Sequence, residues 1–213
     1  MKIGILGSGG VAQSLAAGFI GRGDSVMLGT RETAKLAGWK TAAGPAASVG
    51  SFADTAAFGE AIVLATLGTA TVAAVEAAGS ASFDGKVVID VTNPLTFERG
   101  FPELTIGFND SLGESVQRAI PKAKVVKAFN TVGAELMVNP RLPGGPPDMF
   151  MAGNDAEAKA FVAAIVRDFN WNVVDLGGIE QSRQLEALCV VWVQYGRKTG
   201  TFTHAFKLLH QQP

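Results

Sequence analysis

The sequence predicts a doubly wound α/β fold with a mostly parallel sheet and a C-terminal helical extension. Two observations support this prediction. Short, continuously apolar runs recur along the chain, and Ala-rich segments of helix length separate them. Parallel strands are covered by helices on both faces, so they are expected as continuous rather than alternating hydrophobic runs. Strand and helix alternating at this spacing are typical of βαβ units wound on both sides of one sheet.

Each apolar run is expected to form a strand, and each Ala-rich segment a helix. The expected strands are 2–6, 25–29, 61–66, 86–92, 124–130, 149–153 and 172–178. The expected helices are 11–23, 54–60, 71–80, 155–169 and 179–200, followed by a short helix ending near 206–210. Residues 93–110 are too long for an ordinary connection, so we expect a partly mobile loop covering a site. Residues 139–148 are rich in Pro and Gly and predict a connection.

Composition bounds the classes of protein that this chain can belong to. We expect one domain over 1–213, with 180–213 as its C-terminal helical extension. The formal net charge of -1 gives no general attraction to nucleic acid. Cys189 is the only cysteine, which excludes an intrachain disulfide and favours a reducing, cytoplasmic setting. No apolar stretch is long and continuous enough to predict a membrane span.

The stretch GILGSGGVA follows the first strand and opens the first helix. Gly7, Gly9 and Ala12 fit the pattern G-x-G-x-x-G/A of a dinucleotide-binding Rossmann unit. Gly7 permits the tight turn, and Gly9 lets the backbone approach a pyrophosphate. The helix beginning near Gly10 then offers free N–H groups and its dipole to that anion.

The stretch GTRE, residues 29–32, follows the second strand, where an NAD enzyme usually places an acid against the ribose. Thr30 and Arg31 stand there instead, and Lys35 follows one helical turn later. A guanidinium binds a 2′-phosphate bidentately, so these residues predict NADP(H) as the cofactor. In the alternative, Arg31 and Lys35 are solvated surface charges and Glu32 binds the ribose.

Polar residues at the carboxyl ends of later strands are further candidates, because open α/β sheets bind ligands there. These candidates are Thr66, Leu67, Gly68, Thr92, Asn93, Pro94, Asn130 and Thr131. Asn93 and Asn130 could equally be turn residues.

A protein acid or base for oxidising an alcohol is harder to find. His204 is the better of the two histidines, because its segment could fold back over the site, although a terminal histidine is more often on the surface. The sequence has no Tyr-x-x-x-Lys pair and no metal-binding motif, and no metal site is expected. Hydride transfer between NADPH and a redox ring needs ring alignment more than a proton relay, so that chemistry is favoured.

Five blocks of sequence together resemble the F420-dependent NADP oxidoreductase family over nearly the whole chain. The blocks are MKIGILGSGGVAQSLAAGF, GTRE…K, VVIDVTNPL, VVKAFNTVGAELM and LGGIEQSRQLEAL. The reductase domain of the STEAP metalloreductases is a more distant resemblance. The family implies a homodimer joined by C-terminal helices, with Asn130 to Gly133 facing the nicotinamide and the deazaflavin. It places the 2′-phosphate on Thr30, Arg31 and Lys35, and the pyrophosphate on Gly7, Ser8, Gly9, Gly10 and Val11.

Three functions follow as hypotheses. The first is hydride transfer between NADPH and a deazaflavin (F420) or flavin acceptor. The second is NADPH-dependent reduction of a small carbonyl or imine compound, with Asn130 or His204 supplying a hydrogen bond. The third is a non-catalytic NADPH-binding sensor.

The C-terminal helix independently predicts a homodimer, because its apolar face exceeds what one domain edge covers. In the alternative, the same face packs on the sheet. The residues of this face are Leu185, Leu188, Val191, Trp192 and Tyr195.

Overall fold

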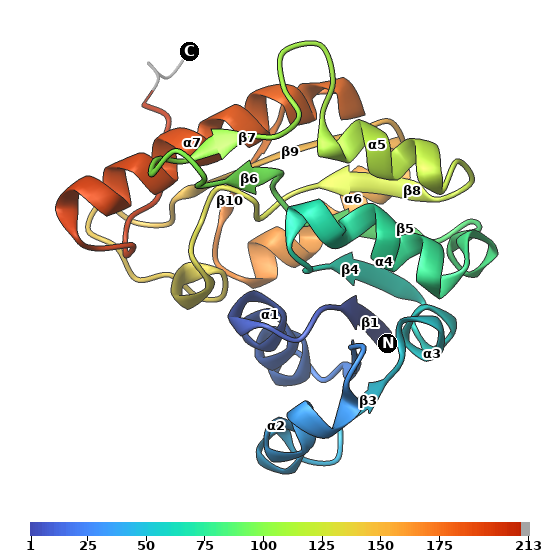
Figure 1. The fold of residues 1–213 in the computed structure, drawn as a ribbon. Coiled ribbons are helices and arrows are strands. Elements are labelled where there is room, and N and C mark those ends of the chain that lie inside the picture. Colours follow the sequence, from blue (N-terminus) through green and yellow to red (C-terminus); the bar gives the residue numbers. More distant parts are fainter. Residues whose placement is uncertain (210–213) are drawn as a thin grey trace.

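A computed structural model describes residues 1–209 and contains one eight-stranded sheet (Figure 1). The strand order is β10-β9-β8-β5-β4-β1-β2-β3. All neighbouring pairs are parallel except β8 and β9, which are antiparallel. The doubly wound, mostly parallel fold predicted from the sequence is therefore confirmed. The strands of the sheet are β1 (Lys2–Leu6), β2 (Ser25–Gly29), β3 (Ala47–Gly50), β4 (Ala61–Leu64), β5 (Val87–Asp90), β8 (Lys124–Lys127), β9 (Asp148–Gly153) and β10 (Asn172–Asp175).

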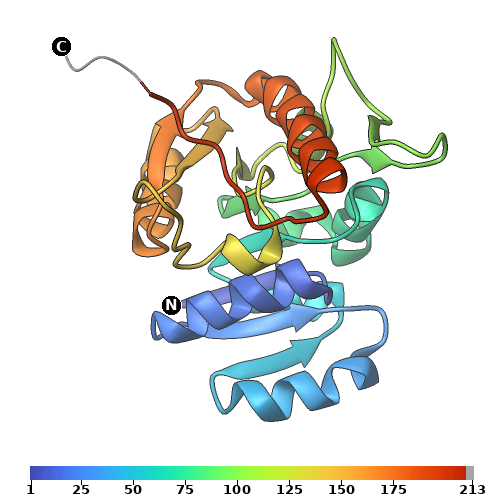
Figure 2. The ribbon, with the colours of Figure 1, turned by 90° about the vertical axis from the view of Figure 1, so that its left-hand side faces the viewer.

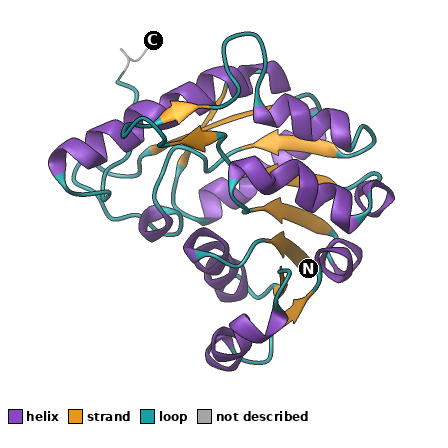
Figure 3. Ribbon diagram, viewed as in Figure 1, coloured by secondary structure: helices purple, strands orange, loops and turns teal. Residues whose placement is uncertain are grey.

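Helices cover both faces of this sheet (Figure 3). They are α1 (Gly10–Gly21), α2 (Ala37–Ala43), α3 (Phe52–Phe58), α4 (Thr71–Ala78), α5 (Leu112–Ala119), α6 (Ala156–Asp168) and α7 (Ser182–Thr199). Short 3-10 helices are η1 (Thr33–Leu36), η2 (Gly68–Ala70), η3 (Ser80–Phe83), η4 (Ala134–Leu136) and η5 (Ile179–Gln181). Within the described residues, no helix combines the length and the apolar composition needed to cross a bilayer.

The strands are apolar on both sides because each face packs into a separate core. In β4, Val63 packs into the cluster that α1 and α6 cover, whereas Ile62 and Leu64 pack into the cluster under α3, α4 and α5. All three side chains are buried. The continuous hydrophobic runs of the sequence are therefore explained by two-sided burial.

Several elements were not predicted, because they contain few large apolar residues. The β3 strand contains only one large apolar residue, Val49, and α2 buries none of its residues. The α5 helix begins after Ser111, whose hydroxyl caps the backbone N–H of Glu114. The expected loop over 93–110 contains a two-stranded hairpin, formed by β6 (Leu95–Thr96) and β7 (Glu103–Leu104).

The C-terminal segment differs from the expectation of a second short helix. After α7, Gly200 adopts a left-handed conformation with φ of 73°, and residues 201–209 form no regular helix or strand. Figure 2 shows this segment, coloured dark red, turning back beside α7. Phe202 and His204 pack their rings on Trp192, at centroid distances of 5.5 and 4.7 Å. These contacts hold the segment against α7 without the predicted helix. The last residue of that prediction, residue 210, lies outside the described part of the chain.

The apolar face of α7 is divided between the core and the surface. Leu185 and Trp192 are buried against the rest of the chain, as in the alternative that this face packs inward. Val191 and Tyr195 are 56% and 54% exposed and remain the uncovered part of the face.

Candidate functional site

A pocket of about 850 Å³ lies where the carboxyl ends of β1, β2, β4 and β5 meet. This is the edge at which open α/β sheets bind ligands. Its lining comprises Gly7, Ser8, Gly9, Gly10, Val11, Gly29, Thr30, Arg31, Phe52, Ala65, Thr66, Leu67, Gly68, Thr69, Ala70, Ala73, Ala74, Ala77, Val91, Thr92, Asn93, Leu95 and Phe97.

The glycine turn after β1 leaves the N-terminus of α1 open to the pocket. Gly7 has φ of 143°, and a Cβ there would collide with the carbonyl of Ala65, so the turn requires glycine. A Cβ on Gly9 or Gly10 would meet nothing within 4 Å, so both backbones face open space. Gln13 braces the turn with a hydrogen bond from Nε2 to the Ser8 carbonyl of 2.9 Å.

The N-terminus of α1 is free to bind an anion from this open side. No side chain caps the helix, and its first turn contains no acidic residue. The uncapped N–H groups and the helix dipole both favour negative charge at this point. With the pocket in front of it, this end of α1 has the geometry that a pyrophosphate requires.

The residues of the GTRE stretch, with Lys35 after it, separate into those that line the pocket and those that do not. Thr30 and Arg31 line the pocket, whereas Glu32 and Lys35 do not. Lys35 Nζ lies 2.8 Å from Glu32 Oε2. A hydrogen bond from Lys35 and its positive charge hold the pKa of the Glu32 carboxyl below its usual value. Glu32 is therefore paired with Lys35, and Arg31 is the cation that lines the pocket.

The loop after β4 packs tightly against the loop after β5. A Cβ on Gly68 would collide with the backbone carbonyl of Asn93, so this close approach requires glycine. The hydroxyls of Thr66 and Thr71 lie 3.0 Å apart, joining the loop to the first turn of α4. Leu67 is 80% exposed and lines the pocket.

Asn93 lines the pocket, and Asn130 lies behind it. Asn93 Nδ2 donates to the Asn130 carbonyl at 2.8 Å, and Asn130 Nδ2 donates to Asn93 Oδ1 at 2.9 Å. The second donor contact of Asn130 Nδ2 is with the Leu185 carbonyl, also at 2.9 Å. Asn130 is 3% exposed, and both hydrogens of its amide are used within the chain. These contacts place the Asn130 amide against Asn93, and its predicted part in cofactor binding and catalysis stays a prediction.

The other predicted site residues lie outside the pocket lining. Pro94 and Thr131 are buried next to the two asparagines in sequence. His204 is held by Trp192: its ring stacks on the indole, and its Nε2 lies 3.1 Å from the Trp192 carbonyl. The structure does not bring His204 to the pocket, and its part in the reaction stays a prediction. His210 lies outside the described residues.

A buried charge cluster, Asp90, Lys127 and Glu186, supports the floor of the pocket. Lys127 Nζ lies 2.8 Å from Asp90 Oδ2 and 2.8 Å from Glu186 Oε1, and all three side chains are at most 1% exposed. Lys127 Nζ also donates a hydrogen bond to the carbonyl of Thr92, which lines the pocket, at 2.8 Å. Burial alone would lower the pKa of Lys127, but the two carboxylates outweigh it and raise that pKa.

The same cluster reaches the C-terminal helix. Glu186 of α7 accepts hydrogen bonds from the backbone N–H groups of Leu112 and Gly113 at the start of α5, both at 3.0 Å. Sequence reasoning missed the cluster because its members are far apart in the chain. The signals were two charged residues, Asp90 and Lys127, each inside an apolar run that is otherwise a buried strand.

Sequence reasoning also missed the walls of the pocket. Phe52 of α3 and Phe97 of the β6–β7 hairpin line it, together with small residues of α4. No local motif marks these residues, because their place follows from how the helices and the hairpin pack. The hairpin does border the pocket, as expected of the 93–110 segment, and its mobility stays a prediction.

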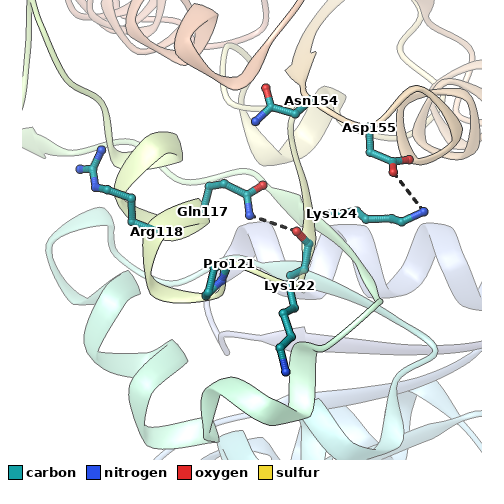
Figure 4. Close-up of a pocket in the computed structure, with 8 residues that line it drawn as sticks. Gln117, Arg118, Pro121, Lys122, Lys124, Asn154 and Asp155 are labelled. Atoms are coloured by element: carbon teal, nitrogen blue, oxygen red, sulfur yellow. Dashed lines mark hydrogen bonds and ion pairs between the residues drawn. The ribbon is translucent and has the colours of Figure 1, made fainter.

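A second hollow, of about 560 Å³, lies at the amino end of β8 (Figure 4). Its lysines already have partners: Lys124 Nζ lies 3.1 Å from Asp155, and Lys122 Nζ lies 2.9 Å from Asp84. Arg118 is paired with Asp110 at 2.7 Å. The cations of this hollow are neutralised within the chain, so the first pocket is the candidate site.

Comparison with known proteins identifies a family and several similar structures. Residues 2–94 match the family described as NADP oxidoreductase, coenzyme F420-dependent. The crystal structure of a candidate F420-dependent NADP reductase from Arthrobacter sp. FB24 is 41% identical with a TM-score of 0.94, covering 99% of this chain and 100% of that chain. A reductive aminase from Aspergillus terreus shares 17% identity with a TM-score of 0.67, covering 93% of this chain and 62% of that chain, which shows the fold alone.

Among curated proteins, metalloreductase STEAP3 of Rattus norvegicus is 29% identical over 188 residues. That match covers 88% of this chain but 36% of the relative, so the chain spans about a third of its length. The likeness to the Arthrobacter structure covers 99% of this chain and all of the other, and it confirms the predicted family and enzyme class. The chain belongs to the F420-dependent NADP oxidoreductase family, whose members are NADP-dependent oxidoreductases.

Proposed function

We propose that this protein transfers a hydride between NADP(H) and a planar redox acceptor, a deazaflavin such as F420 or a flavin. The observation that carries the proposal is the chemistry of the pocket. Of the described residues that line it, Arg31 is the only one with an ionisable side chain. A reaction that needs a side chain to give or take a proton is poorly served there, whereas alignment of two rings is well served.

The cofactor contacts of this proposal follow the pocket from one end to the other. The uncapped N-terminus of α1 binds the pyrophosphate, and Thr30 and Arg31 bind the 2′-phosphate. Lys35 has a smaller part, because Glu32 holds its ammonium. Thr66, Leu67, Gly68 and Asn93 border the nicotinamide.

The reaction balances without a protein acid. NADPH gives up a hydride, which carries two electrons, and leaves as NADP⁺. The acceptor ring takes the hydride and one proton from water. In this scheme Asn130 is a positioning residue, since its amide acts on Asn93 and not on the substrate.

The second candidate, reduction of a carbonyl or imine, needs a proton donor at the reduced atom. Only the hydroxyls of Ser8 and the lining threonines and the amide of Asn93 could serve within the described lining. His204 could serve only if the C-terminal segment moved. The third candidate, an NADPH-binding sensor, needs the cofactor contacts alone.

Stopped-flow oxidation of NADPH tests the proposal against oxidised F420, FMN, riboflavin, ferric chelates and a panel of carbonyl and imine compounds. Rapid oxidation by a ring acceptor, with slower reaction of the carbonyl panel, is the expected result. Turnover of carbonyls or imines alone would favour the second candidate. Tight NADPH binding with no oxidation by any acceptor would favour the sensor.

We also propose that residues 1–213 act as one domain, with 180–213 as its C-terminal extension, and that two copies pair through α7. The exposed Val191 and Tyr195 lie one helical turn apart on that helix and support this pairing. Because Leu185 and Trp192 are already buried within the chain, the proposed interface is narrower than the full apolar face.

A further inference from the structure

We propose that Arg197 is a specificity residue for the hydride acceptor, selecting a planar redox ring whose side chain carries a phosphate over the same ring without one. The proposal rests on the hydride transfer proposed above and names the acceptor class for that reaction. Flavins and deazaflavins both exist in the two forms, so they share the relevant chemistry.

The first element of this acceptor site is an exposed aromatic ring. Phe97, in the β6–β7 hairpin, lines the pocket and is 45% exposed. Leu67 lines the same pocket and is 80% exposed. Large apolar side chains left open in a pocket suit a flat, largely apolar ring, which can stack on the phenyl group.

The second element is a cation stacked on that ring. Arg197, in the last turn of α7, has its guanidinium carbon 5.6 Å from the centroid of Phe97. Its Nη2 donates to the carbonyl of Gly100 at 2.7 Å, which fixes the arginine against the hairpin. A guanidinium has five N–H donors, so four stay available to a ligand.

Arg197 carries an uncompensated charge, unlike its neighbour in the hairpin. Arg99 is paired with Glu103, whereas Arg197 forms no ion pair within residues 1–209. Positive charge is therefore present at both parts of the site, with Arg31 in the lining and Arg197 at the hairpin. A ring seated against Phe97 brings a phosphate on its side chain within reach of the second cation.

A purely structural role is the competing explanation, because Arg197 also joins α7 to the hairpin. The two roles differ in what the loss of the charge changes. A clamp supports every acceptor equally, so its loss leaves the preference between acceptors unchanged. A phosphate contact acts on one form only, and its effect falls as salt screens the exposed charge.

The experiment measures kcat/KM for FMN and riboflavin, and for F420 and its phosphate-free ring form, at low and high salt. We expect a preference of about tenfold for the phosphorylated member of each pair, as for one partly screened charge-assisted contact. Arg197→Ala should reduce this ratio to near one, and Arg197→Lys should retain part of it. Lys198→Ala is the matched control: it removes an equal charge one residue later, at a side chain that forms no hydrogen bond or ion pair with the hairpin within residues 1–209, and should keep the ratio.

Phe97→Leu separates stacking from charge. It should lower kcat/KM for both members of a pair while keeping their ratio above one. The affinity for NADPH, measured by fluorescence titration, should be unchanged in the Arg197 and Lys198 variants, whose side chains lie outside the pocket lining. A ratio that survives in Arg197→Ala, or that high salt leaves unchanged, would overturn the proposal and leave the proposed function standing. NADPH binding without turnover of any ring acceptor would overturn the proposed function and this proposal with it.

Discussion

Replacing Arg31 with alanine should remove most of the preference of this protein for NADPH over NADH. Arg31 lines the pocket, and its rival for the ribose, Glu32, is outside the lining and paired with Lys35 at 2.8 Å. Two charge-assisted hydrogen bonds to a 2′-phosphate, taken at the low end because the side chain is exposed, contribute about 3 kcal/mol. At about 1.4 kcal/mol per tenfold, this corresponds to a preference of roughly a hundredfold.

Calorimetric titration of NADPH and NADH into the wild type and Arg31→Ala measures this difference. The variant should lose affinity for NADPH by that factor and bind NADH almost as before, because NADH never used the contact. Arg31→Lys should recover only part of the loss, since an ammonium lacks the planar fork. Glu32→Gln is the control and should leave NADH binding unchanged. Equal affinities of the wild type for the two cofactors, or a loss of NADH binding in Glu32→Gln, would refute the reasoning.

Three further predictions concern burial, charge and assembly. Burial raises the pKa of the Cys189 thiol to about 12, so the native protein at pH 8 should not react with a thiol reagent until it is unfolded; rapid labelling would contradict this. Lys127→Met leaves the carboxylates of Asp90 and Glu186 facing each other in the core, and chemical denaturation should show a loss of about 3–5 kcal/mol; a loss below about 1 kcal/mol would show that the cluster is not a buried ion pair in solution. Tyr195→Glu places a charge on the exposed face of α7 and should convert a sedimenting dimer to a monomer; a wild type that sediments only at 22.1 kDa at micromolar concentration would reject the dimer.

The sheet was predictable because its signal is local. Burial on both faces demands apolar residues at successive positions, so strands such as β1 and β4 stand out in the sequence. The β3 strand was missed because it pairs only with β2 and needs few large side chains. The short helix expected after residue 200, ending near 206–210, was wrong over residues 201–209, because packing on Trp192 outweighs local preference in that segment.

The candidate site was predictable where the backbone conformation requires particular residue types. The turn at Gly7 needs glycine, and the N-terminus of α1 needs an open approach, so both leave a pattern in the sequence. The contacts of Asn130 were not readable in the same way, because the two acceptors of its amide, Asn93 and Leu185, lie far from it along the chain. Residue type alone could not show that both hydrogens of the Asn130 amide are bonded within the chain.

The charge cluster around Lys127 also limits how this protein can be divided. The segment 2–94 that matches the family contains Asp90. The lysine that pairs with Asp90, Lys127, comes from β8, and the second carboxylate on Lys127, Glu186, comes from α7. A fragment cut after residue 94 would therefore expose an acid at the cleft floor and release the Thr92 carbonyl that Lys127 holds. For anyone grafting this nucleotide-binding unit into another protein, the smallest transferable piece extends to the end of α7, more than twice the length of the matched segment.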